Sequence, residues 1–331
     1  MKTNNDTNDG GYLCGVSNTS CATGDWRQSY ANKIVKYIQD YAAQGVKINH
    51  IGFLNEPDLN TTYASMQSSG QQAADFIEIL YPTLQRANLS SVGIACCDGS
   101  GWEQNRERLT GLQAAGAEQY LDIVTSHAYS SPIGTAFNTS KRVWMTEYAT
   151  YDPTNYAWAS SAAPTSQSDG ITWAQHLMMG FGTSNTSAFF YWWGAANTTD
   201  NESLILITPN GTDAVVPTKR LYAYQHYGSR FLYPTQSYRV GATLGGSGTS
   251  NLNVTAFSNP DGSMAVQVLN SGSANATVSL TGIKFGKNAE VTTYTTDNER
   301  DFDQAKPIST NGGKIVGLVP AQALVSFVIG Q

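Results

Sequence analysis

Charge is scarce in this 331-residue chain, in which only 13% of the residues are Asp, Glu, Lys or Arg and the formal net charge is −6. No run of Lys or Arg occurs, which argues against nucleic acid and anionic membrane surfaces as partners. No apolar run is long enough for a transmembrane helix, and no signal peptide is recognisable. These absences predict a neutral ligand held by hydrogen bonds and aromatic stacking, for which 18 Tyr and 7 Trp supply the ring faces.

Cysteine is also rare, with four residues in the chain. Cys14 and Cys21 flank the turn-like stretch "GVSNTS". In an oxidising compartment they would close a short loop, so we predict a disulfide between them. Cys96 and Cys97 are adjacent, and for them the favoured interpretation is two small, buried, apolar side chains on a strand.

N-glycosylation motifs, Asn-x-Ser/Thr without an intervening proline, recur along the chain. Each one alone means little in a sequence rich in Ser, Thr and Asn. Together with the low charge and the cysteine pattern, they predict a secreted eukaryotic protein. The asparagines concerned are Asn5, Asn18, Asn60, Asn88, Asn138, Asn185, Asn197, Asn201, Asn210, Asn253 and Asn275.

Hydrophobic residues make up 40% of the chain, enough for a sizeable core. Up to about residue 233, short apolar runs alternate with amphipathic segments, which predicts a parallel sheet covered by helices, either open or closed into a barrel. The expected strands are 51–54, 91–97, 122–129, 142–149 and 187–194. The expected helices are one that Asp25 caps and Gly45 ends, then segments near 71–87, through Leu109 and Leu112, near 170–181, and over 218–232.

After residue 238 the pattern changes to short alternating strands separated by Gly, Asn, Pro and Asp, which is typical of an antiparallel β-sandwich. The expected strands are 251–258, 263–271, 276–282, 290–296 and 323–330. The sequence therefore predicts an α/β domain over 1–233 and a β-sandwich side domain over 234–331. Since no long flexible linker separates the two, we expect the sandwich to pack against the α/β part.

Two glutamates follow apolar strands in the same way. Glu56 comes after "IGFL", where Pro57 prevents the strand from continuing, and Glu147 ends "RVWMTE". In an α/β barrel the carboxyl ends of all strands face one cleft, so the two side chains can meet there. Two carboxyl groups across a cleft are the minimal machinery for cutting a glycosidic bond. The alternative is that each is a solvated loop residue; Asp98, after "GIACC", is a third carboxylate in an equivalent place.

At these residues a family resemblance becomes plain. "GFLNEPD" and "VWMTEY" resemble the acid/base and nucleophile motifs of clan A glycoside hydrolases. The longer stretches "DWRQSYANKIVKYIQDYAAQGVKINHIGFLNEPD" and "GIACCDGSGW", with the closing "GLVPAQALVSFVIG", resemble the fungal xylanase and glucuronoxylanase branch of glycoside hydrolase family 30. The resemblance extends over essentially the whole chain, and the long stretches make it specific.

The resemblance implies roles for individual residues. Glu56 would be the acid/base and Glu147 the nucleophile, and the reaction would need no metal and no cofactor. Retention of anomeric configuration would place the carboxyls about 5–5.5 Å apart, and the charge of Glu147 would raise the pKa of Glu56. The residues expected to bind or orient the sugar or the glutamates are Asn55, His127, Tyr129, Trp192, Trp193, Tyr148 and Trp102.

Structural alternatives accompany three of these residues. His127 could equally be a hydrogen-bonded core histidine. Trp192 and Trp193 are neighbours on an expected strand, so one of the two could belong to the core because adjacent strand residues point to opposite faces.

The resemblance also implies that strands four to eight of a (β/α)8 barrel are present here and that the first three are missing. The loops after the early strands, which in the family decide whether a glucuronic acid side group is needed, would be missing too. From five strands rather than eight, we expect residues 1–331 alone to be poorly soluble or nearly inactive.

The sequence thus predicts a secreted, monomeric, retaining endo-β-1,4-xylanase or glucuronoxylanase. An alternative within the family is an endo-β-1,6-glucanase or β-1,6-galactanase, which would share both glutamates. A non-catalytic carbohydrate-binding protein is the alternative from another class. The combination of Glu56, Glu147 and Asn55 argues against it, because a lectin needs neither an acid nor a nucleophile.

Overall fold

The structure, a computed structural model, describes residues 1–4, 8–150, 157–159, 170–197, 202–207, 214–228, 230–283, 290–308 and 314–330. The chain forms two compact units. The first contains Met1–Tyr148 and Ser184–Phe190, and the second contains Ala149–Thr183 and Tyr191–Gln331. The motif asparagines Asn5, Asn201 and Asn210 lie outside the described residues.

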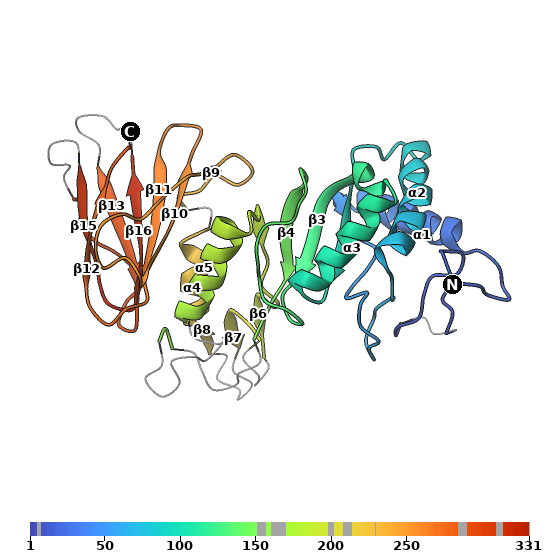
Figure 1. Ribbon diagram of the computed structural model, residues 1–331, viewed down its shortest axis with the longest axis horizontal. Helices are drawn as coiled ribbons and strands as arrows, with labels where there is room; N and C mark the ends of the chain where they lie inside the picture. Colours follow the sequence, from blue (N-terminus) through green and yellow to red (C-terminus); the bar gives the residue numbers. More distant parts are fainter. Residues whose placement is uncertain are drawn as a thin grey trace. The chain divides into compact units, whose positions relative to one another are not determined.

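The first unit is built on a parallel sheet of five strands in the order β1-β2-β3-β4-β5. Figure 1 shows two of them, β3 and β4, beside α3. Every neighbouring pair is parallel and follows the chain in sequence, which is how the strands of an α/β barrel progress. Together they form a curved half-barrel, and a closed barrel of eight strands is not seen in the described residues. The strands are β1 His50–Ile51, β2 Gly93–Gly99, β3 Leu121–His127, β4 Arg142–Glu147 and β5 Ala188–Phe189.

Three helices accompany these strands: α1 Arg27–Ala43, α2 Gly70–Arg86 and α3 Trp102–Ala114, with the 3₁₀ turn η1 Ala117–Tyr120 before β3. They pack in chain order, α1 on α2 and α2 on α3, and α3 lies against β2 and β3. A capping box fixes the start of α2, because Ser69 accepts the backbone N–H of Gln72 while the Gln72 side chain accepts that of Ser69. Gly45 follows α1 with a φ of +80°, the conformation that makes glycine a good terminator.

Several local expectations need correction. The strand expected over 187–194 is only Ala188–Phe189, and the helix expected over 218–232 covers only Lys219–Gln225. The strand expected over 51–54 is only His50–Ile51, because β1 lies at the edge of the sheet and pairs with β2 over two residues. Trp26, not Asp25, occupies the cap position of α1. The Asp25 carboxylate still accepts the backbone N–H of Arg27, at 2.9 Å, and pairs with its guanidinium.

Both cysteine pairs form disulfides. The predicted Cys14–Cys21 bond is confirmed, with the Cα atoms 5.7 Å apart. Cys96 and Cys97 are buried on β2 as expected, with 2% and 3% exposed, but they are bonded to each other. Here the favoured interpretation was wrong: an apolar pattern indicates burial but carries no information about oxidation of the sulfur atoms.

We expect the double substitution Cys14→Ser/Cys21→Ser to lower the free energy of unfolding by about 2 kcal/mol, because the bond restricts the unfolded chain over a short loop. Chemical denaturation of both proteins under non-reducing conditions measures the difference. Peptide mapping of the unreduced protein tests whether the Cys14–Cys21 bond exists, and two free thiols at these positions would contradict it.

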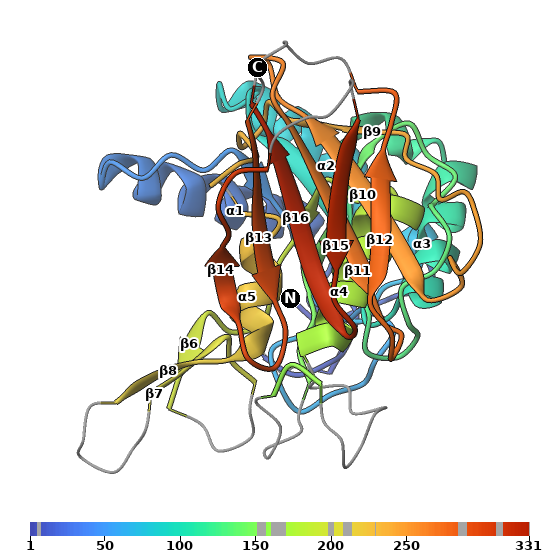
Figure 2. The ribbon, with the colours of Figure 1, turned by 90° about the vertical axis from the view of Figure 1, so that its left-hand side faces the viewer.

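The second unit contains a β-sandwich (Figure 2). A six-stranded antiparallel sheet in the order β14-β13-β16-β11-β10-β9 is covered by the two-stranded sheet β12-β15. The expected strands are confirmed, and β9, β14 and β15 are additional. Their bounds are β9 Tyr238–Val240, β10 Leu252–Ser258, β11 Met264–Asn270, β12 Ala276–Leu280, β13 Val291–Thr296, β14 Asp301–Gln304, β15 Ile315–Val319 and β16 Ala323–Ile329.

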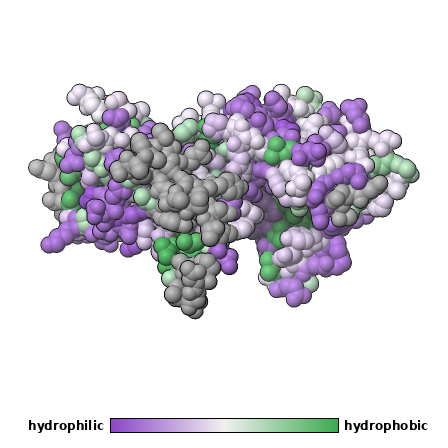
Figure 3. All heavy atoms as spheres, turned by 90° about the horizontal axis from the view of Figure 1, so that it is seen from below, coloured by the Kyte–Doolittle hydropathy of each residue, from purple (hydrophilic) through white to green (hydrophobic). Residues whose placement is uncertain are grey.

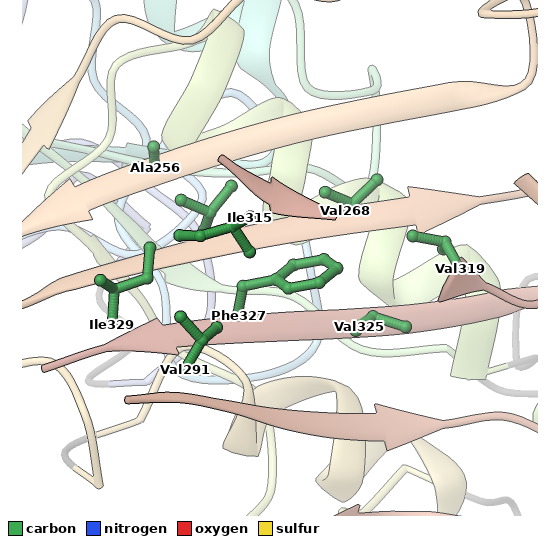
Figure 4. Close-up of a cluster of buried hydrophobic side chains, with 9 residues drawn as sticks. Ala256, Val268, Val291, Ile315, Val319, Val325, Phe327 and Ile329 are labelled. Carbon is green, nitrogen blue, oxygen red and sulfur yellow. The ribbon is translucent and has the colours of Figure 1, made fainter. Parts of the chain in front are cut away.

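Phe327 lies at the centre of the sandwich core (Figure 4). Its ring is fully buried and is surrounded by aliphatic side chains from both sheets. Gly317 on β15 makes this packing possible, since a Cβ atom there would lie 2.2 Å from Cε1 of the Phe327 ring. The core residues are Ala256, Val266, Val268, Val291, Ile315, Val319, Val325, Phe327 and Ile329.

Helices α4 Gly170–Met178 and α5 Lys219–Gln225 belong to the same compact unit as the sandwich, with the π-helical turn η2 Met179–Thr183. α4 contacts β10 and β16, and α5 contacts β14. The fully buried His226 ring joins the end of α5 to the large sheet, because its nitrogens bond the hydroxyls of Ser326 and Thr296. A small sheet, β6 Ala195–Ala196, β7 Ile205–Ile207 and β8 Val215–Pro217, was not expected from the sequence.

The surface agrees with the low-charge, polar composition. Figure 3 shows one face on which polar and intermediate residues predominate and the apolar ones form small groups. Judged against the thickness of a bilayer, every helix in the described ranges is too short or too polar to span it.

Candidate active site

Glu56 lies on the loop that follows β1, in the left-handed conformation with a φ of +46°. Its backbone N–H donates to the carbonyl of Asp98 at 2.8 Å, which ties the loop to β2. The carboxyl group is 8% exposed. It accepts the hydroxyl of Tyr63 on Oε2, while Nδ1 of His127 lies 3.1 Å from Oε1. A non-glycine residue in this conformation is uncommon and is held there by its surroundings.

Glu147 is the last residue of β4 and lies beside the end of β3, where it is in register with His127. Its side chain is 23% exposed and accepts the hydroxyl of Tyr129 on Oε1 at 3.2 Å. This is the contact expected for Tyr129. Parallel strands therefore deliver a second carboxyl group to the same edge of the sheet as the Glu56 loop.

The two carboxyl groups are close together. Oxygen atoms of Glu56 and Glu147 and a ring nitrogen of His127 all lie within 4.8 Å of one another. His127 is 2% exposed and is hydrogen-bonded, so it is both a buried histidine and a member of the site. Three such groups are close enough to hold a metal ion, although the His127 and Glu56 side chains already face each other, with Nδ1 3.1 Å from Oε1. A hydrogen-bonded network explains the arrangement without an ion.

The electrostatics of the site follow from burial and mutual charge. Burial raises the pKa of Glu147, the positive charge of His127 opposes the rise, and the charge of Glu56 adds to it, so that the pKa stays above its usual value. Burial alone would lower the pKa of His127. The hydrogen bond with Glu56 and the charges of Asp98 and Glu147 outweigh that effect, and the pKa is raised.

The other expected site residues of the first unit differ in accessibility. Asn55 is half-buried and lines a cavity of about 400 Å³ together with Leu54. Tyr148 is 8% exposed and packs edge-on against Tyr129, with the ring centroids 5.6 Å apart. Trp102 is fully buried at the start of α3, where its indole N–H donates to the carbonyl of Thr135 at 2.8 Å. This position leaves Trp102 no exposed ring face on which a sugar could stack, so it does not serve as a pocket wall.

Trp192 and Trp193 belong to the second compact unit, beyond the end of β5. They are 39% and 37% exposed, and their ring centroids are 5.5 Å apart. The alternative that one of the two is a core residue is therefore wrong, because β5 ends at Phe189 and the alternation of a strand does not apply. Both offer ring surface to solvent.

Two residues of the site were missed in the sequence. Tyr63 donates to Glu56 from the irregular segment between β1 and α2, where no periodic pattern marks a position. Thr146 donates its hydroxyl to Oδ1 of Asp98. The only feature of the sequence that pointed to Thr146 was its position next to Glu147 in a strand. Asp98 had been noted as a carboxylate at a strand end, but no role had been assigned to it.

The chemistry available is that of two carboxyl groups at close range, one more exposed than the other, with hydroxyl and imidazole groups to set their protonation.

The family model described as the glycosyl hydrolase family 30 beta sandwich domain matches residues 236–327. The catalytic domain of the family 30 xylanase C from Talaromyces cellulolyticus is 40% identical, with a TM-score of 0.90, and the match covers 100% of this chain and 73% of that one.

The chain belongs to glycoside hydrolase family 30. Two bacterial members of family 30 have the same fold at lower identity. A subfamily 8 xylanase from Clostridium acetobutylicum is 22% identical with a TM-score of 0.77, over 100% of this chain and 77% of that one. An endoxylanase from Clostridium papyrosolvens C71 is 19% identical with a TM-score of 0.71, over 92% and 72% of the two chains. The family 30 fold therefore extends over both compact units described above.

Proposed function

We propose that this chain is the catalytic part of a retaining, endo-acting glycoside hydrolase that cleaves β-1,4-xylan or glucuronoxylan. The observation that carries the proposal is the carboxyl pair, because oxygens of Glu56 and Glu147 lie within 4.8 Å of each other. Carboxyls of retaining enzymes are about 5–5.5 Å apart, whereas those of inverting enzymes leave room for a water molecule at about 6.5–9.5 Å. The 40% identity to a fungal xylanase supports the choice of xylan.

In this proposal Glu147 is the nucleophile and Glu56 the acid/base. The Glu147 carboxylate attacks the anomeric carbon while Glu56 donates its proton to the departing oxygen, which leaves a covalent glycosyl-enzyme. Glu56, now ionised, then takes a proton from water as that water attacks the same carbon and releases Glu147. Tyr129 holds the Glu147 carboxylate by its hydroxyl, and Tyr63 and His127 hold that of Glu56.

The remaining assignments complete the proposal. Asn55 would hydrogen-bond the sugar 2-hydroxyl, Tyr148 would contribute to the pocket wall, and Trp192 or Trp193 would stack on a sugar ring. The reaction as written needs neither a metal nor another cofactor. The enzyme would act as a monomer.

The barrel would be completed by further strands. Within the described ranges β1 pairs with β2 on one side only, so its other edge could accept a parallel strand. We assign residues 1–233 to a (β/α)8 barrel of this kind and residues 234–331 to the side domain. Until that edge is filled, the loop that carries Glu56 is held from the β2 side alone, and we expect residues 1–331 alone to hydrolyse xylan poorly.

Secretion and N-glycosylation are supported by where the motif asparagines lie. Every one of them in the described ranges is exposed, whereas Asn105, Asn259 and Asn270, which are not in such motifs, are buried. The exposed set is Asn18, Asn60, Asn88, Asn138, Asn185, Asn197, Asn253 and Asn275. Digestion with a glycosidase specific for N-glycans, followed by mass measurement of the protein secreted from a eukaryotic host, tests the assignment.

Side-by-side hydrolysis of xylan, glucuronoxylan, pustulan and β-1,6-galactan tests the function. We expect cleavage of the first two and retained configuration in NMR spectra of the first products. Cleavage of pustulan or galactan alone would transfer the assignment to the β-1,6-glucanase or galactanase alternative. If a preparation with a complete barrel binds these polysaccharides but does not hydrolyse them, the alternative of a non-catalytic carbohydrate-binding protein is favoured.

The raised pKa of Glu147 has a consequence for pH dependence. The nucleophile must be ionised, so kcat/KM should fall on acidification at a higher pH than an ordinary glutamate would give. The Tyr129 hydroxyl stabilises the carboxylate, so Tyr129→Phe should raise the pKa and shift the acid limb of the profile to still higher pH. An acid limb that moves to lower pH in Tyr129→Phe would contradict the role assigned to Glu147.

A further inference from the structure

Asp98 contacts the acid/base residue through its backbone. It lies on β2 in the left-handed conformation, with a φ of +51°, and its carbonyl accepts the N–H of Glu56 at 2.8 Å. Its own N–H donates to Oγ1 of Thr125 at 3.2 Å. Glu56 and Asp98 are thus two non-glycine residues in an unfavourable conformation that are joined by a backbone hydrogen bond, and such outliers gather at functional sites.

The Asp98 side chain contacts the same residue indirectly, through His127. Oδ1 of Asp98 lies 3.7 Å from Nε2 of His127, while Nδ1 of that ring lies 3.1 Å from Glu56. The His127 side chain is 3% exposed and that of Asp98 15% exposed, so water screens their charges little. Thr146 fixes the carboxylate from β4 by donating its hydroxyl to Oδ1.

The His127 ring therefore has carboxylate oxygens facing both of its nitrogens. A neutral imidazole has a single N–H, and only the imidazolium can present one to each side. The groups that face the ring are Glu56 from the loop after β1, Asp98 from β2, Glu147 from β4 with Oε2 at 4.0 Å, and the edge-on ring of Tyr129. Among the contacts found in the described residues, the charged or ionisable groups around the His127 ring are thus three acidic side chains and one tyrosine, and none is basic.

We propose that Asp98 is a positioning residue of this active site: its carboxylate keeps His127 charged and oriented, so that Nδ1–H holds the Glu56 carboxyl, and its carbonyl holds the Glu56 backbone. The inference rests on the proposed function for its kinetic consequence, but the state of His127 is independent of turnover. The charge of Asp98 is one of the causes that raise the pKa of His127. Burial raises the pKa of Asp98 itself, and the charge of His127 and the hydroxyls of Thr146 and Thr125 oppose that rise, so the two charges stabilise each other.

The decisive variant is Asp98→Asn, which keeps the volume, the carbonyl and an acceptor for Thr146 but removes the charge. We expect the midpoint of the His127 ring titration, followed by NMR of labelled histidine, to fall below that of the unsubstituted protein. The chain has four histidines, and burial lowers the pKa of His176 to about 4 and that of His226 to about 3, which separates their signals from that of His127. In enzyme with a completed barrel, kcat should fall roughly 10- to 100-fold with little change in KM, by analogy with the hydrogen-bond partners that orient metal ligands.

The chain offers a matched control at the opposite end of the same strands. Asp122 on β3 lies 2.7 Å from Nε2 of His50, so Asp122→Asn also removes a carboxylate beside a histidine. It should leave both the His127 titration and kcat unchanged. Thermal unfolding of the two variants, measured in parallel, shows whether either has lost its fold.

A double-mutant cycle separates positioning from a purely structural role. Since Asp98 acts on the chemistry through His127, Asp98→Asn should add little to the loss of kcat already caused by His127→Gln. Additive losses, or an unchanged His127 titration in a folded Asp98→Asn protein, would overturn the proposal. If Asp98→Asn does not fold, the titration of the unsubstituted protein decides, because a His127 midpoint below that of an ordinary histidine contradicts it. Asp98→Asn could alter the His127 titration while neither the variant nor the unsubstituted enzyme hydrolyses xylan. That result would refute the proposed function but not the inference about Asp98.

Discussion

Glu147→Gln should reduce xylan hydrolysis by several orders of magnitude, measured in enzyme that contains the completed barrel. The amide is nearly the same size and can still accept the Tyr129 hydroxyl, but it cannot form the covalent glycosyl-enzyme. KM should change far less than kcat, because the substituted atom reacts in the transition state rather than binding the ground state. Steady-state kinetics on xylan measure both.

Azide distinguishes the roles of the two glutamates. With Glu147→Ala, azide in the vacated space should replace the nucleophile and yield a glycosyl azide of inverted configuration. With Glu56→Ala and an aryl xyloside, whose phenolate departs without a proton, azide should attack the glycosyl-enzyme and give the glycosyl azide of retained configuration. The control is Glu103→Gln on α3, a glutamate whose side chain is 58% exposed and pairs with Arg106, and which should leave kcat unchanged. The opposite pattern of azide products would reverse the assignment.

Phe327→Ala should lower the free energy of unfolding by about 3–5 kcal/mol, the range for removing a buried phenylalanine. The ring fills the space between the two sheets and packs against Gly317, so its loss leaves a cavity that rigid strands cannot close. Chemical denaturation followed by tryptophan fluorescence and circular dichroism measures the loss.

Leu318→Ala provides the comparison, because Leu318 is on β15 directly after Gly317 but is 56% exposed. This substitution also truncates an apolar side chain to Cβ, but that side chain is mostly in water, so the stability should change by less than about 1 kcal/mol. An equal loss in the two variants would show that the cavity is not what destabilises Phe327→Ala.

Element type and order were predictable because they follow from periodicity. The alternating residues of β10, β11 and β16 and the buried run of β3 are visible in the sequence, and strand order in the first unit follows from strand–helix alternation. The length of β1 was not predictable, because it depends on how much of an edge strand finds a partner. The strands β6, β7 and β8 have two or three residues each, too few to show a period.

The carboxyl pair was predictable for a different reason. Parallel strands bring their carboxyl ends to one edge, so a position directly after an apolar run is also a position in space. Glu147 follows from that rule, whereas His127 and Tyr129 were expected at the site because of the family resemblance. Tyr63 does not follow from the rule, since it reaches Glu56 from a loop whose path is set by tertiary contacts. Trp102 shows the opposite failure, because the family resemblance implied a pocket residue where the chain starts a helix that buries the ring.

The pairing of the cysteines determines how the protein responds to thiol chemistry. All four lie in the described ranges and none is free. Alkylating reagents, mercurials and the quinones formed from oxidised plant phenolics attack thiolates and would find none here until a reductant is added. A cysteine introduced at an exposed position would accordingly be the single thiol of the folded protein, available for a fluorophore or a spin label without removal of native residues.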